Sequence, residues 1–422
     1  MRILTASLLI SGLALPILAQ EQPLLSPSLH AYGLYGTSSA EHPGDFAAGG
    51  HDPSRKDALV LQAAEASVSL RWGNHLEGFV TGLAYSDEND NLEWEWEEYF
   101  LKLTDLPAGM ELRGGRMLSR VGFHNPTHLH SWGTVDAPLV HSLFLGEDGL
   151  ALEGGDLSFY LDTEHPTVFT LGFGQRPAHD HDHGHDHEDE DHDDHADEDH
   201  DDHADDDHDD DHEHTGFGSY EEYRVKDDVL TVGVRRDHLF SDFKKLGLSG
   251  FGGMGDNESG STSWFAGAGF EYQWRENGFE PGGRALRWRT EAIRFFSDGG
   301  EHDHEEEDHD HEEDHDHDDH DHDEYDHEES VFSKVSTWGI TTELTYEAHP
   351  RFHPFGRIDY VAAADALDLP DWTRYTLGMT FPLLDDPGLF LRVQGNADER
   401  GEESEQSVWA QFGFNWGGGE VR

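Results

Sequence analysis

Segments of about ten residues with a two-residue period recur along this chain, and they constrain its fold more than any other feature. In one of them, Trp264 and Phe270 belong to an apolar set that alternates with small or polar residues such as Gly267 and Glu271. Side chains with this period point to opposite faces of a β-strand. The pattern recurs at 286–292, 374–381 and 408–416. We therefore predict an all-β fold.

Each such segment has one apolar face and one polar or charged face, with aromatic residues near its ends. Transmembrane β-barrel strands have this character, because lipid lies outside and water inside. A soluble β-sandwich or jelly roll is the alternative, since Arg and Glu on the polar face suit either solvent. A helical membrane protein is excluded, because no run of roughly 18 apolar residues follows Gln20. The 47 glycines and the aromatic last segment favour the barrel.

We predict a transmembrane antiparallel β-barrel of about sixteen strands, an even number as in bacterial single-chain barrels. The expected strands cover residues 29–36, 57–72, 75–86, 93–104, 110–118, 149–161, 167–175, 223–236, 244–254, 262–275, 284–297, 333–348, 351–364, 372–382, 388–397 and 406–417. With both ends in the periplasm, connections after even-numbered strands should be short turns and those after odd-numbered strands longer surface loops.

The N-terminal residues predict the cellular location of the protein. Residues 1–20 have a single positive charge, Arg2, before an apolar run, which is the layout of a secretory signal peptide cleaved near Ala19 or Gln20. A membrane anchor helix is the alternative. The absence of Cys excludes a lipid anchor, disulfides and thiolate metal sites. Residues 21–422 are then expected to form a barrel embedded in the lipid of a bacterial outer membrane.

Two acidic tracts contain most of the histidine. Residues 179–214 hold 12 His and 21 Asp or Glu, and residues 301–329 hold 9 His and 19 Asp or Glu, with no Lys or Arg in either. They follow predicted strands seven and eleven, so they are expected outside the cell. The whole chain has a formal net charge of −63. A chain this acidic, without a basic stripe, repels phosphate backbones, which excludes nucleic acid as a partner.

The alternation of His and Asp in the tracts predicts divalent metal binding. Imidazole nitrogen with carboxylate oxygen suits Zn²⁺ first, and Ni²⁺ or Cu²⁺ next. The tracts have too few apolar residues to fold, so we expect long disordered surface loops that act as a multivalent metal trap. A solvated acidic loop that binds Ca²⁺ weakly is the alternative, although it would not need His. The expected ligands are His179, His181, His183, His185, His187, His192, His195, His200, His203, His302, His304, His309, His311, His315, His317, His320 and His322.

A second concentration of candidate ligands lies in the connection at residues 120–146. We predict a metal site from His124, His128, His130 and Asp136, placed where this connection dips into the lumen. The alternative is that these His residues make turn and cap hydrogen bonds with the loop backbone, and the sequence does not decide between the two.

Several short motifs lie between residues 45 and 175. They are Gly49-Gly50-His51-Asp52-Pro53, Glu97-Glu98-Tyr99, Gly114-Gly115-Arg116, Gly122-Phe123-His124-Asn125, His128-Leu129-His130-Ser131-Trp132, Val135-Asp136-Ala137-Pro138 and Phe144-Leu145-Gly146. Together they resemble the zinc-regulated outer-membrane porin-like proteins, often labelled zinc-regulated TonB-dependent outer-membrane receptors. The resemblance implies an outer-membrane barrel made under zinc limitation. In the first motif, His51 and Asp52 fit turn chemistry better than metal ligation.

A TonB-dependent transporter needs about 22 strands and an N-terminal plug. The first expected strand follows the signal too closely for a plug, so a plug-free channel is the better inference. We therefore predict a porin-like channel that captures divalent metal, zinc first, on extracellular loops and admits it to the periplasm. The alternative is a surface metal-sequestering protein whose barrel is only an anchor. No Ser-centred nucleophile elbow or paired acid is present, so we expect no enzyme activity. The sequence leaves a homotrimer open.

Overall fold

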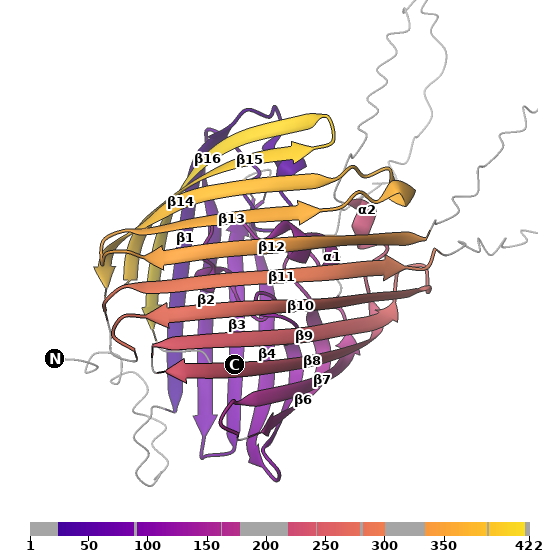
Figure 1. Ribbon diagram of the computed structural model, residues 1–422, viewed down its shortest axis with the longest axis vertical. Helices are drawn as coiled ribbons and strands as arrows, with labels where there is room; N and C mark the ends of the chain where they lie inside the picture. The colour runs from indigo at the N-terminus through magenta and orange to yellow at the C-terminus, as the bar shows by residue number, and fades with distance from the viewer. Residues whose placement is uncertain are drawn as a thin grey trace, which may run out of the picture.

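The computed structural model describes residues 24–87, 91–161, 163–177, 218–241, 243–278, 282–299, 334–385 and 388–417. The predicted signal peptide and both acidic tracts lie outside the described residues. The described chain forms sixteen antiparallel strands in one closed barrel (Figure 1). This confirms the predicted all-β barrel and its strand number.

The strand bounds lie close to those expected from the two-residue period. The strands are β1 (Leu25–Ser38), β2 (Leu59–Trp72), β3 (Leu76–Ser86), β4 (Leu92–Leu106), β5 (Met110–Leu118), β6 (Ala151–Leu161), β7 (Thr167–Gln175), β8 (Asp227–Ser241), β9 (Lys244–Asp256), β10 (Thr262–Arg275), β11 (Ala285–Ser297), β12 (Val335–Glu347), β13 (His353–Val361), β14 (Trp372–Asp385), β15 (Gly388–Arg400) and β16 (Glu403–Gly417). Every strand pairs with its neighbours in sequence, and the first pairs with the last.

The barrel closes where β1 meets β16, with a register that runs from Ser28 opposite Gly417 to Ser38 opposite Ser407. In Figure 1 the strands follow one another around the barrel in the order of the chain. Closure leaves no strand edge with unpaired N–H and C=O groups, which is the condition for a sheet to lie in lipid.

The two faces of the barrel differ in polarity as the alternation predicts. On β14, Tyr375 and Leu377 are 47% and 74% exposed on the outside, whereas Arg374 and Thr376 are buried toward the lumen. On β7, Phe169 and Leu171 are likewise exposed. An apolar exterior around a polar interior is the arrangement of a membrane-spanning barrel.

The connections at the two ends of the barrel differ in length. Even-numbered strands are followed by short turns, such as 73–75 and 107–109. The four longest connections, 39–58, 119–150, 176–226 and 298–334, all follow odd-numbered strands. The expectation of a longer loop after every odd-numbered strand is wrong at 87–91, 257–261 and 401–402, which are short turns. The two connections that contain the acidic tracts therefore leave the barrel at the same end as 119–150, as predicted. Which side of the membrane this end faces stays a prediction.

The helices are short and belong to the connections. They are α1 (Leu139–Leu145), α2 (Gly218–Glu221) and the 3-10 helices η2 (Pro43–Phe46), η3 (Leu129–Ser131) and η4 (Asp365–Leu367). All seven residues of α1 are buried, and this helix packs against the luminal side of β11, β12 and β13. In the described part of the chain, no helix has the length and apolar character needed to cross a membrane.

Candidate metal site in the barrel lumen

The connection at residues 119–150, here called the luminal loop, crosses the interior of the barrel. At one point His128 contacts Glu98 on β4, and at another Gly133 lies against Glu343 on β12. These two strands stand eight places apart in the ring of sixteen, so they are on opposite walls. The loop therefore narrows the lumen, as the sequence led us to expect of a loop that dips inward.

Side chains of the wall hold the luminal loop by its backbone. Arg392 on β15 donates to the carbonyl oxygens of Trp132 and Thr134, at 2.9 and 2.7 Å. The amide of Val135 donates to Gln394 Oε1 at 2.8 Å. Buried backbone groups are costly unless they are paired, and here strand side chains pair them. The loop is thus a fixed part of the barrel interior.

His128 is the predicted ligand with the most carboxylate neighbours. Its Nε2 lies 2.7 Å from Glu98 Oε2, and its Nδ1 lies 3.1 Å from Glu97 Oε2 and 3.6 Å from Glu65 Oε1. The His128 side chain has no exposed surface. Glu65, Glu97 and His128 each offer a ligand atom, all within 4.8 Å of one another. These residues could hold a divalent ion with nitrogen and oxygen ligands.

A β-bulge brings the two adjacent glutamates to the same face. The pairing of β3 with β4 shifts so that Thr81 opposes Glu98 while Gly82 opposes Trp96, which leaves Glu97 as the extra residue. Regular alternation would point either Glu97 or Glu98 into the lipid. A bulge re-aims one side chain. Both carboxylates therefore reach His128.

His130 extends this cluster along the wall. Its Nδ1 lies 2.9 Å from Glu65 Oε2, and its ring stacks on that of His30 with 4.2 Å between centroids. His30 in turn contacts Asn415 Oδ1 through Nδ1 at 2.9 Å. The structure thus brings together two of the predicted ligands, His128 and His130, with acidic residues of β2 and β4.

The carboxylates set the protonation of His128. Burial opposes the charged form, but Glu97 and Glu65 outweigh it and hold the pKa of His128 well above 6.5. Without a metal, an imidazolium therefore balances the acidic wall. A metal ion must displace that proton to bind the ring nitrogen.

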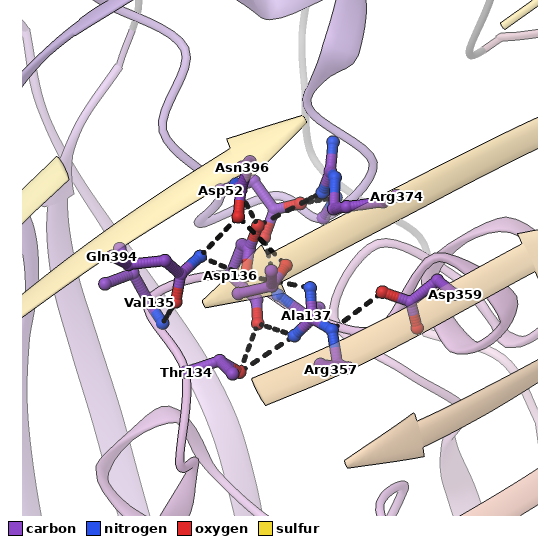
Figure 2. A network of polar contacts seen from close by, with 12 residues as sticks. Asp52, Thr134, Val135, Asp136, Ala137, Arg357, Asp359, Arg374, Gln394 and Asn396 are labelled. Carbon is purple, nitrogen blue, oxygen red and sulfur yellow. Dashed lines mark hydrogen bonds and ion pairs between the residues drawn. The ribbon is translucent and has the colours of Figure 1, made fainter. Parts of the chain in front are cut away.

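Asp136, the fourth predicted ligand, lies apart from the histidines in a network with arginine (Figure 2). Its Oδ1 accepts hydrogen bonds from Arg357 and Gln394 at 2.9 and 2.7 Å, and its Oδ2 accepts from Asn396 and Arg374 at 2.9 and 3.2 Å. Burial raises the pKa of Asp136, but the two arginines reverse this and hold it below its usual value. With both oxygens already paired, Asp136 anchors the luminal loop to the wall.

His124 forms a separate pair with His141, with 4.9 Å between ring centroids. His141 Nε2 lies 3.3 Å from Glu291 Oε2, and the same carboxylate accepts the backbone N–H of His124 at 3.0 Å. Burial and the neighbouring His141 hold the pKa of His124 well below 6.5, so its ring is neutral. Gly122 has a φ of +69°, and a side chain there would collide with Glu291. His124 thus belongs to a second cluster.

Sequence reasoning missed the acidic partners, which are Glu65, Glu97, Glu98 and Glu291. The segment Glu93-Trp94-Glu95-Trp96-Glu97-Glu98 did contain a signal, because its alternation breaks at two adjacent Glu residues. Such a break inside a strand indicates a bulge. The tract histidines, from His179 to His203 and from His302 to His322, lie outside the described residues.

No family model and no curated protein matches the chain. Solved structures do. The anion-selective porin from Comamonas acidovorans is 10% identical, with 93% of this chain and 99% of that one covered and a TM-score of 0.50. Salmonella typhi OmpF is 10% identical, with 92% and 97% covered and a TM-score of 0.47. The trimer form of Vibrio cholerae OmpT is 8% identical, with 93% and 98% covered and a TM-score of 0.48.

At these identities the likeness to the Comamonas porin concerns the fold alone. The fold, the apolar exterior and the closed ring agree with one another. The chain is a sixteen-strand porin-fold barrel of the bacterial outer membrane.

Proposed function

We propose that this protein is a porin-like channel that captures divalent metal, zinc first, on its two acidic His tracts and admits it through the lumen to the periplasm. The observation that carries the proposal is the cluster of His128 with Glu65, Glu97 and Glu98, set where the luminal loop narrows the barrel. Nitrogen and oxygen donors without sulfur suit Zn²⁺, as in the tracts.

The distances within the cluster are compatible with a divalent ion that binds briefly and is then released. Two ligand atoms about 2.1 Å from a tetrahedral ion lie roughly 3.4 Å apart. The distances from His128 Nδ1 to Glu97 and Glu65, 3.1 and 3.6 Å, bracket that value. Small shifts would let these groups bind an ion, and a channel site must also release it. Acidic tracts at one mouth would raise the local cation concentration.

The second candidate function is metal sequestration at the cell surface, with the barrel as an anchor. The path of the luminal loop favours it, because the loop reaches from β4 to β12 and is largely buried. If the loop blocked the lumen, no ion would pass, and metal binding by the tracts would be the remaining function. Neither candidate includes enzyme activity.

Conductance in a planar bilayer tests the two candidates. We expect the parent protein to carry a cation current that Zn²⁺ blocks, because a bound ion at the constriction impedes other ions. Glu97→Gln should weaken the zinc block at least tenfold, whereas His75→Ala, in the exposed β2–β3 turn, should not. A folded barrel without any conductance would favour the anchor instead.

A further inference from the structure

A second set of ligand atoms lies where the turn at residues 48–52 meets β4 and the end of the luminal loop. His51 Nε2 is 3.4 Å from Glu95 Oε1 and 3.4 Å from Asp148 Oδ1. The His51 side chain is only 7% exposed, yet neither ring nitrogen has a hydrogen-bond partner, and Asp148 Oδ1 has none either. A side chain at Gly50 would come within 2.8 Å of Asp148 Oδ1, so the glycine makes room for this approach.

The distances fit a metal ion better than a direct contact. A charge-assisted N–H···O bond is about 2.7–2.9 Å long. The observed 3.4 Å is longer, and it equals the roughly 3.4 Å expected between two ligands of a tetrahedral Zn²⁺ ion. The three ligand atoms all lie within 4.8 Å of one another. Buried polar atoms without partners indicate a missing ligand.

The backbone around His51 is held in place from two sides. Asp52 Oδ2 accepts the N–H groups of residues 48 and 49, and its Oδ1 accepts the N–H of Ala137 in the luminal loop at 2.8 Å. Gln62 on β2 donates to the carbonyl oxygen of His51 at 2.9 Å. Ligands fixed in this way need little reorganisation to bind an ion. Asp52 therefore makes the turn hydrogen bonds that the sequence predicted. His51 instead points its ring toward Glu95 and Asp148.

Strand β4 shows which of the two clusters lies nearer the mouth of the barrel. Strand β4 begins at the end of the barrel that has the long connections, and Glu95 precedes Glu97 by two residues. Two residues of regular strand rise ~7 Å, and the bulge at Glu97 shortens this step, so the two clusters are neighbours along β4. The His51 cluster therefore lies between the His128 cluster and the mouth at which the long connections leave the barrel.

We propose that His51, Glu95 and Asp148 bind a divalent metal ion, Zn²⁺ first, at the mouth side of the luminal constriction. Three protein ligands leave one position of a tetrahedral ion for water, which is the open coordination of an exchangeable site. The site is the first stop for an ion that moves from the tracts toward His128. Only this role in transit rests on the proposed function; the binding itself does not.

The test uses the full-length protein with all 21 tract His residues replaced by Asn, so that tract binding does not mask the lumen. Zn²⁺ alone is added, and bound zinc is counted after equilibrium dialysis. We expect His51→Ala and Glu95→Gln each to remove about one ion per chain or to weaken its binding at least tenfold. His75→Ala is the matched control. Equal zinc binding in all three variants would overturn the proposal.

Glu95→Gln guards against a trivial loss through misfolding, because it keeps the shape of the side chain. Each variant must also keep the heat-dependent gel mobility of a folded barrel. A further comparison separates this proposal from the proposed function. Loss of one zinc ion in His51→Ala, together with no passage of zinc through the parent protein, would support the binding site and reject the channel.

Discussion

At the scale of single residues, buried charges fix the luminal loop. Asp136 and Arg357 are at most 1% exposed and are paired with each other, and Arg374 and Asp398 continue the network into β14 and β15. Burying charges is expensive, and removing one partner leaves the other without compensation. The network therefore holds the loop only while every member is present.

Asp136→Asn should consequently destabilise the barrel by about 3 kcal/mol, because two buried guanidinium groups each lose one of their carboxylate partners. Urea unfolding in detergent, followed by tryptophan fluorescence, measures the change. Glu258→Gln is the control, since Glu258 is half-exposed and pairs with a half-exposed lysine. An equally small effect of both substitutions would show that the network does not support the fold.

The protonation of His51 gives a prediction about pH. Burial opposes the charged ring, but Asp148 and Glu95 outweigh it and raise the pKa of His51 to about 10. A raised folded-state pKa stabilises the fold below ~6.5, and this stabilisation is lost as pH rises toward the folded value. Metal-free protein should therefore become steadily less stable from this group as the pH rises from 7.5 to 9. His51→Gln should show a shallower decline in urea midpoint, and an unchanged slope would contradict this.

At the scale of elements, strand bounds could be predicted and contacts between distant segments could not. Two-residue alternation is local, so it located all sixteen strands. The partners of the luminal loop are not local: Arg374 reaches Asp136 across 238 positions. Likewise, nothing in the sequence pairs Glu97 with His128. Asp136 was therefore expected beside His124 and His128, whereas the fold places it against arginine.

The bulge in β4 supports a prediction about this element. Deleting Glu97 should restore regular pairing with β3, because Trp96 would still face lipid and Glu98 would still face the lumen. We expect a folded barrel in which zinc binding at the His128 cluster is weakened at least tenfold, measured in the background that lacks tract His. Glu97→Gln, which keeps the bulge, should weaken zinc to a similar degree. If the deletion variant binds zinc normally, the bulge has no part in the site.

At the scale of the whole molecule, the parity of the strands puts the starts and ends of both tract-containing connections at one end of the barrel. Epitopes inserted at Ala196 and Asp319 should both be labelled on intact cells, and an epitope at Asn74 should be labelled only after permeabilisation. If only the epitope at Asn74 is labelled on intact cells, the barrel has the opposite orientation in the membrane. The homotrimer stays a prediction, which sedimentation in detergent would check.

Zinc entry into proteoliposomes that contain a zinc-sensitive dye tests the central claim most directly. The parent protein is compared with the variant in which all 21 tract His residues are Asn, which keeps the carboxylates and the length. At low external zinc the parent should fill the vesicles several-fold faster, because imidazole ligands concentrate zinc at the mouth. At saturating zinc the two rates should converge, because the lumen is the same. Equal entry rates at every zinc concentration, or no entry through either protein, would contradict the account.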